Sequence, residues 1–343
     1  MDTTPFLKRK MMLNTIRPRR NRVNQGIRNL VSESVLLPQK LILPIFLEDA
    51  KGVKTEIKSL PGVYRYSVDT AIDFIAEAIS YGVNSFILFP SIKEDLKDST
   101  ATFSYHQDNF YLHAIRSFKS KFPDAIFVSD VALDPYNIDG HDGIVRNGEI
   151  INDETLDVLA KMAVAQAEAG FDILGPSDMM DGRIGVIREA LDKNGYQNTG
   201  IMSYCAKYAS AFYGPFRDAL DSAPKAGDKK SYQMDPLNRQ EALIEAQLDQ
   251  QEGADYLMVK PALHYLDVIS DLKAFSNLPI AAYHVSGECA MLKAACLNGW
   301  LNYDVAMPET LNSIHRAGAD IVISYFALDY AKWWHKTYGR ATS

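Results

Sequence analysis

Eight short apolar runs, each followed by a loop and then a segment of helical periodicity, most constrain the fold of this chain. Strands that alternate with helices pair in parallel through right-handed crossovers. The runs are Leu41–Leu47, Ser85–Phe89, Ala125–Ser129, Asp172–Gly175, Gly200–Tyr204, Tyr256–Lys260, Ile280–Tyr283 and Ile321–Tyr325. The helical segments include Val68–Tyr81, Glu154–Ala169, Leu237–Glu252, Leu266–Phe275, Glu288–Asn298 and Tyr303–Ala317. Eight such units predict an α/β protein, a closed (β/α)₈ TIM barrel.

Three short sequence repeats support the repeating strand–loop–helix unit. Gly170-Phe-Asp, Gly253-Ala-Asp and Gly318-Ala-Asp each stand between a helical segment and an apolar run, where glycine caps a helix C-terminus. The alternative is a doubly wound open sheet, but the chain lacks the glycine-rich phosphate-binding motifs that would favour that fold.

The first residues differ in composition from the rest. Residues 1–30 hold eight Lys or Arg against Asp2 alone, whereas the whole chain has a net charge of -7. A basic arm binds nucleic acid or a membrane, or it lies on the acidic surface of a neighbouring subunit. We favour the subunit contact, because the body is acidic. We therefore divide the chain into an N-terminal arm, residues 1–38, and a catalytic barrel, residues 39–343, with no nucleic-acid or membrane partner.

Composition also bears on the compartment. The three cysteines have no CxxC spacing, so they indicate neither a disulfide framework nor a thiolate zinc site. Residues 1–14 lack the apolar core of a signal peptide, and no apolar stretch is long enough to span a bilayer. We expect a cytoplasmic protein.

The apolar run that ends at Lys260 carries the first candidate for catalysis. Pro261 follows it and cannot continue a strand, so the strand delivers an amine at its last residue. A desolvated lysine has a lowered pKa and forms a Schiff base with a ketone. The alternative is a lysine that extends from a strand end to solvent.

A second lysine, Lys207, follows the neighbouring predicted strand. Two ammonium groups close together disfavour each other's charged form, which favours imine chemistry. The active site of a (β/α)₈ barrel lies at the carboxyl ends of the strands. Other polar side chains predicted at these ends are Asp130, Ser177, Tyr283, Ser286 and Tyr325.

A long loop, about Tyr208 to Pro236, follows the Lys207 strand and predicts a lid over the site. It carries Arg217 with the aromatic residues Tyr213 and Phe216, which suits a small carboxylate substrate. We interpret Lys225 and Lys230, from the same loop, as solvated charges.

Four carboxylates and a histidine lie between Asp130 and Asp142. Oxygen ligands such as Asp134 and Asp142 suit a hard divalent cation. Equally, Asp and Asn before Gly or Pro are ordinary turn residues, so the stretch leaves both interpretations open.

Several long motifs resemble the porphobilinogen synthase (5-aminolevulinate dehydratase) family. They are RPRRNR (17–22), LILPIF (41–46), SDVALDPY (129–136), PSDMMDGRIG (176–185), YCAKYASAFYGPFRDA (204–219), QMDPLNRQEA (233–242), EGADYLMVKPAL (252–263), AAYHVSGE (281–288) and ISYFA (323–327). The resemblance implies a homo-octameric barrel lyase of heme (porphyrin) biosynthesis that condenses two molecules of 5-aminolevulinate to porphobilinogen, with loss of two waters.

The resemblance also implies a role for each site residue. Lys260 would form the Schiff base with the substrate that contributes the propionate side, and Lys207 with the one that contributes the acetate side. Asp130 would shuttle protons. The acetate-side carboxylate would be bound by Arg217, Lys229 and Gln233, and the propionate-side carboxylate by Ser286 and Tyr325. Ser177, Tyr213, Phe216 and Tyr283 would complete the pocket.

One departure concerns metals. Zinc-dependent members of the family have three cysteines at the positions of Ala132, Asp134 and Asp142. The chain therefore resembles the branch without active-site zinc, in which a glutamate at the position of Glu245 binds an allosteric Mg²⁺. The alternatives are a single-lysine class I Schiff-base aldolase and a non-catalytic assembly protein whose arm binds nucleic acid.

Overall fold

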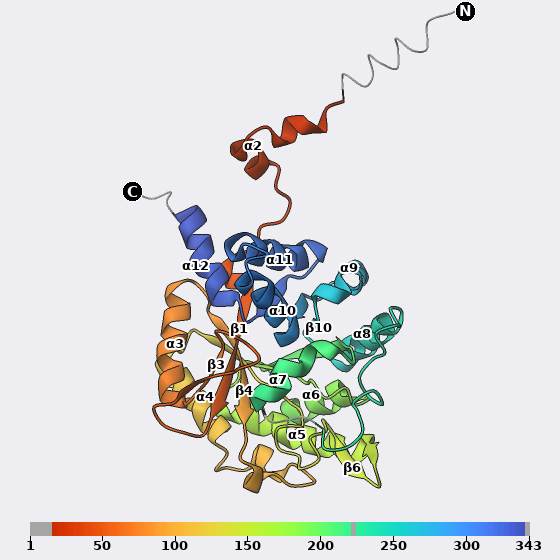
Figure 1. Cartoon of the computed structure of the whole chain (residues 1–343). Coiled ribbons are helices and arrows are strands. Elements are labelled where there is room, and N and C mark those ends of the chain that lie inside the picture. Colours follow the sequence, from red (N-terminus) through yellow and green to blue (C-terminus); the bar gives the residue numbers. More distant parts are fainter. Residues whose placement is uncertain (1–15, 221–223, 340–343) are drawn as a thin grey trace, which may run out of the picture. The chain divides into compact units, whose positions relative to one another are not determined.

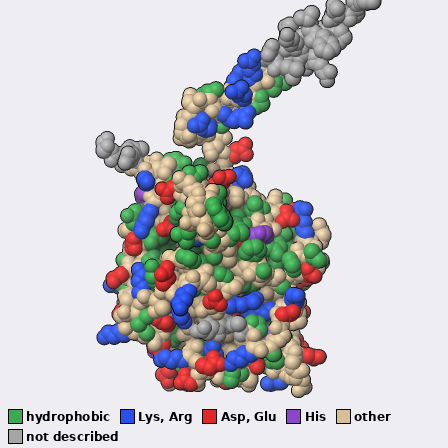
Figure 2. All heavy atoms as spheres, in the orientation of Figure 1, with side chains coloured by type: hydrophobic (Ala, Val, Ile, Leu, Met, Phe, Trp, Pro, Cys, Tyr) green, Lys and Arg blue, Asp and Glu red, His purple; other side chains and the backbone are tan. Residues whose placement is uncertain are grey.

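The computed structural model of the chain describes residues 16–220 and 224–339. The chain divides into two compact units, Met1–Val35 and Leu36–Ser343. In the first, a 3₁₀ helix, η1 (Pro18–Arg22), precedes α2 (Gln25–Leu30). Figure 2 shows Lys and Arg side chains gathered on this unit. The subunit contacts expected of residues 1–38 stay a prediction.

The second unit is a closed parallel barrel, as predicted (Figure 1). The last barrel strand pairs with the first, Leu41 with Val322 and Ile42 with Ile323, so the sheet has no open edge here. The eight barrel strands are β1 (Leu41–Glu48), β4 (Ser85–Ser91), β5 (Ile126–Val128), β8 (Ile173–Leu174), β9 (Gly200–Lys207), β10 (Tyr256–Lys260), β11 (Ile280–His284) and β12 (Ile321–Ser324). Every predicted apolar run forms one of these strands.

Helices surround the barrel (Figure 1). They are α3 (Val68–Ser80), α4 (Phe110–Lys121), α5 (Asn152–Ala169), α6 (Arg183–Lys193), α7 (Gly214–Leu220), α8 (Glu241–Glu252), α9 (Leu266–Phe275), α10 (Ser286–Leu297), α11 (Tyr303–Ala317) and α12 (Ala327–Tyr338). The prediction that α8 begins at Leu237 was wrong, because a turn closed by Asn238 N–H on the Asp235 carbonyl comes first. No helix in the described residues is long and apolar enough to cross a membrane.

The loops contain several short helices and strands. They are η2 (Pro38–Lys40), β2 (Lys54–Glu56), β3 (Tyr64–Tyr66), η3 (Glu94–Leu96), η4 (Thr102–Tyr105), β6 (Ile144–Arg146), β7 (Glu149–Ile151), η5 (Ala211–Tyr213) and η6 (Leu263–Tyr265). Strand β3 extends the sheet beside β1, and β6 and β7 form a hairpin.

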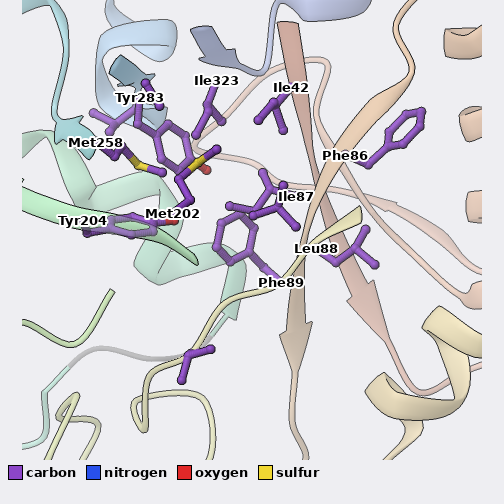
Figure 3. Packing of buried hydrophobic residues seen from close by; sticks show 14 of the residues in the cluster. Ile42, Phe86, Ile87, Leu88, Phe89, Met202, Tyr204, Met258, Tyr283 and Ile323 are labelled. Carbon is purple, nitrogen blue, oxygen red and sulfur yellow. The ribbon is translucent and has the colours of Figure 1, made fainter. Parts of the chain in front are cut away.

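The barrel strands are buried on both faces, because side chains alternate between the interior and the helices. In β4, Ile87 and Phe89 point into the barrel, whereas Phe86 and Leu88 point outward (Figure 3). All four side chains are fully buried. This double burial explains why the strands read as continuous apolar runs.

The three Gly-x-Asp repeats tie helices to strands at the amino end of the barrel. Gly170, Gly253 and Gly318 have φ angles of 110°, 104° and 130°, in the region that favours glycine. Each aspartate then accepts a backbone N–H from the preceding strand. Asp172 accepts from Phe127, Asp255 from Ile201 and Asp320 from Ile280, at 2.8, 2.8 and 2.9 Å.

Substitution of one of these glycines tests the repeat. In Gly318→Ala the Cβ would meet Lys273 Cβ at 2.7 Å in a strained backbone conformation. We expect the free energy of unfolding to fall by about 1–3 kcal/mol. Urea unfolding followed by circular dichroism measures this. Gly185→Ala, at a helix position with only ordinary contacts, is the control; equal stability of the two variants would contradict the prediction.

Candidate active site

The two lysines lie side by side at the carboxyl ends of adjacent strands. Lys207, the last residue of β9, is the register partner of Lys260, the last residue of β10. Between Ser203 and Ala206, β9 has one residue more than β10 has between Leu257 and Val259. This β-bulge changes the alternation of β9, so that Lys207 faces the same side as the inward residues before the bulge.

Aromatic rings surround the Lys260 amine. Its Nζ lies 5.1 Å from the Tyr204 ring centroid, 5.4 Å from Tyr213, 5.1 Å from Phe216 and 4.8 Å from Tyr283. Burial, and secondly the charge of Lys207, lower the pKa of Lys260 to about 7. The rings stabilise the ammonium that remains, but they exclude water from it. Half of the Lys260 amine is thus neutral near pH 7.

Lys207 is equally buried but meets oxygen atoms instead of rings. Its Nζ donates a short hydrogen bond to the Ser177 carbonyl and lies 3.6 Å from Asp142 Oδ2. Ser177 also contacts Asp130, because its Oγ donates a hydrogen bond to Asp130 Oδ1 at 2.7 Å. Burial, followed by the charge of Asp134, raises the pKa of Asp130 to about 7. Asp130 can therefore both give and take a proton near neutral pH.

Lys229 lies in an acidic cluster beside Lys207. Its Nζ is 3.3 Å from both Asp134 Oδ2 and Asp142 Oδ1. Burial opposes the charge of Lys229, but the two carboxylates raise its pKa. Because this ammonium already occupies the space between them, Asp134 and Asp142 as placed do not fit a metal ion.

The lid begins directly over Lys260. Tyr213 Oη donates to the carbonyls of Tyr208 and Lys260, at 2.8 and 3.1 Å, which fixes its ring beside the amine. Phe216 N–H donates to Ser286 Oγ at 3.0 Å. The hydroxyls of Tyr283 and Tyr325 are 3.2 Å apart. Ser286 and Tyr325, both buried, thus lie on the side of Lys260.

Two residues predicted to bind the substrate carboxylate, Gln233 and Arg217, make fewer side-chain contacts. Gln233 is buried, and its backbone N–H donates to the Lys229 carbonyl at 2.9 Å. Arg217, on α7, is half-buried and forms no ion pair with another described residue. Lys225 pairs with Glu94, and the Lys230 side chain is 77% exposed, as expected for surface charges.

Tyr204, the last residue of the predicted strand Gly200–Tyr204, is a site residue to which the sequence assigned no role. Its ring contacts the Lys260 amine, and its buried hydroxyl has no hydrogen-bond partner in the described part of the chain. A tyrosine inside an apolar strand resembles any core residue. The available signal was its place at the end of the predicted strand, and the structure shows that the bulge turns Lys207 to the same face.

Glu245 lies outside this site, on α8. It lines a pocket of about 630 Å³ together with Asn152, Asp181, Glu241 and, from the lid, Gln233. Burial first, then the nearby acidic groups Asp249, Asp181 and Glu241, raise the pKa of Glu245 to about 7 although Arg183 opposes this. No cluster of three His, Cys, Asp or Glu side chains that could hold a metal occurs in residues 16–220 and 224–339.

A closed barrel with two adjacent, buried lysines at its carboxyl end defines an enzyme of the Schiff-base-forming class. A family model for delta-aminolevulinic acid dehydratase matches residues 15–333. The chloroplastic dehydratase of Chlamydomonas reinhardtii is 50% identical over 327 residues, 92% of this chain and 84% of that protein. The dehydratase of Chlamydia pneumoniae is 51% identical over 311 residues, 91% and 94% of the two chains.

A solved structure agrees with these sequence matches. The delta-aminolevulinic acid dehydratase (porphobilinogen synthase) of Toxoplasma gondii ME49, in complex with the reaction product porphobilinogen, has a TM-score of 0.93 and 48% identity. The match covers 96% of this chain and 94% of that one. The chain belongs to the delta-aminolevulinic acid dehydratase family. Its activity is that of a lyase, the formation of porphobilinogen from 5-aminolevulinate.

The Lys260 environment predicts a pH profile. Only the neutral amine attacks a ketone, and a lowered pKa of about 7 makes that form abundant above pH 7. We expect the rate of imine formation on Lys260 to rise about tenfold between pH 6 and pH 8, then level off. Borohydride trapping at a series of pH values measures this rate; a profile still rising steeply above pH 9 would contradict the prediction.

Proposed function

We propose that this chain condenses two molecules of 5-aminolevulinate through Schiff bases on both lysines. The register pairing of Lys207 with Lys260 carries this proposal. An imine makes a ketone carbon electrophilic and its neighbouring carbon acidic, so two ketone substrates need two amines. A single-lysine aldolase would not need the second buried lysine at the same level of the barrel.

Each lysine forms an imine with one of the two substrates. The neutral amine of Lys260 attacks one ketone carbon, and loss of water gives the first imine. Lys207 forms the second imine with the other substrate after it gives up a proton to water, and Asp142 and the Ser177 carbonyl orient its amine. Asp130, with its pKa raised to about 7 by burial and by Asp134, accepts and returns protons as the C–C and C–N bonds form.

Binding of the substrate carboxylates fixes the positions of the two substrates relative to the lysines. We assign Ser286 and Tyr325 to the propionate side, next to Lys260, and Arg217, Lys229 and Gln233 to the acetate side. The substrate carboxylate would replace Asp134 and Asp142 as the partner of Lys229. Tyr213, Phe216 and Tyr283 exclude water, and holding both substrates under one lid makes their reaction local.

We place the chain in the branch of the family without active-site zinc, since Ala132, Asp134 and Asp142 cannot supply thiolates. We assign an allosteric Mg²⁺ to Glu245. The half-buried carboxylate among acidic neighbours fits this ion, because Mg²⁺ commonly binds one or two carboxylates and several waters. The ion would supply positive charge to this cluster.

We assign the basic arm to contacts between subunits of an octamer. Arg19, Arg20 and Arg22 lie in the last turn of η1, and Ile16, Val23 and Leu30 are 73%, 66% and 84% exposed. Exposed apolar groups among cations suit an acidic protein surface. A cytoplasmic location is proposed on the free thiols, since Cys205, Cys289 and Cys296 form no disulfide.

Borohydride reduction in the presence of 5-aminolevulinate, followed by peptide mapping, tests the two-lysine function. We expect label on both Lys260 and Lys207. Either Lys→Met substitution should lower turnover by several orders of magnitude, whereas Lys230→Met should leave it unchanged. Label on Lys260 alone, with Lys207→Met still making porphobilinogen at the normal rate, would instead support the single-lysine aldolase chemistry.

Glu245→Gln tests the magnesium site. We expect activity without Mg²⁺ to stay near that of the parent protein and the stimulation by added Mg²⁺ to disappear, because the ion loses its carboxylate ligand. A titration of activity with MgCl₂ measures this. Glu168→Gln, on the exposed face of α5, is the matched control. A full Mg²⁺ response in Glu245→Gln would refute the assignment.

A further inference from the structure

Gly287, in the first turn of α10, lies against the backbone of the lid. A Cβ at this position would be 2.5 Å from the carbonyl oxygen of Phe212, 2.7 Å from its Cα and 2.9 Å from its carbonyl carbon. All three are backbone atoms of η5, so no side-chain rotation can relieve the contact. Alanine is favoured over glycine in a helix by about 1 kcal/mol, so the helix alone gives no reason for a glycine here.

The contact at Gly287 lies in the middle of a larger interface, in which the lid segment Phe212–Phe216 packs on the first turn of α10. On one side of it, Ser286 Oγ accepts the Phe216 N–H at 3.0 Å. On the other, the Phe212 ring stacks on His264, with centroids 4.2 Å apart. His264 Nδ1 is 3.4 Å from Glu288 Oε1 in the same first turn of α10. Residues 286–288 thus hold both ends of the segment Phe212–Phe216.

This segment carries two of the four rings around the Lys260 amine, Tyr213 and Phe216. We propose that Gly287 is a positioning residue: its missing side chain lets Phe212 dock on α10, and this docking holds the Tyr213 and Phe216 rings over Lys260. The inference rests on the proposed two-lysine function. Gly287 itself touches no reacting atom.

Other charged and polar groups also act on Lys260 and decide how a displaced lid segment would change its protonation. Lys207 from β9 opposes its charge, while Asp130, Asp134 and Asp142 from the loop after β5 favour it. The phenols of Tyr204 and Tyr283, from β9 and β11, stay neutral because burial raises their pKa values. A displaced lid segment would change none of these groups. It would only admit water to Lys260, which restores the charged form.

Borohydride trapping on Gly287→Ala tests the inference. With 5-aminolevulinate at pH 7, we expect the label on Lys260 to fall about fivefold, as for a pKa that rises by one unit. The label should recover at pH 9, which a merely structural defect would not allow. Label on Lys207, which lies away from these rings, should stay near the parent level and serves as the internal control. Gly185→Ala is the matched variant.

Two outcomes overturn the role of Gly287: parent-level label on Lys260 in Gly287→Ala, or equal loss of label from both lysines at every pH. If Gly287→Ala does not fold, Phe212→Ala decides, because it removes the stack on His264 and should also lower Lys260 labelling; unchanged labelling then overturns the role. Absence of label from both lysines of the parent protein overturns the two-lysine function itself, and this inference with it.

Discussion

The removal of two lysine amines from water is the constraint on which the rest of the site depends. A buried ammonium needs either compensating charge or a shift to the neutral form. The barrel uses a different solution for each lysine. Lys207 has carboxylate and carbonyl oxygens within reach, whereas Lys260 has aromatic rings and a lowered pKa. In the proposed two-lysine reaction, two identical substrates would therefore meet unlike surroundings, which is what an asymmetric condensation requires.

The same constraint explains why the lid is built in two parts. Its first residues, up to Phe216, are fixed to β10 and α10 through Tyr213 Oη and Ser286 Oγ. Its later part supplies Lys229, which the acidic cluster holds as an internal cation. One part controls water at Lys260, and the other controls charge near Lys207. The lid thus acts on both amines, although through different physical effects.

Much of this arrangement could be predicted from the sequence. Apolar runs defined the eight strands because each is buried on both faces, and Pro261 marked the end of β10. The pairing of Lys229 with Asp134 and Asp142 could not be predicted, since it joins residues about ninety positions apart whose loops have no periodicity. Tyr204 was placed at a strand end but given no role, because a strand pattern does not reveal a bulge, and the bulge decides which side chains share a face.

The bulge in β9 also decides how many lysines point into the barrel. Strand side chains alternate with a period of two, so without the extra residue Lys207 would point at the helices while Tyr204 stayed inside. Removal of this one residue would therefore turn a barrel with two inward lysines into a barrel with one, without a change to either lysine.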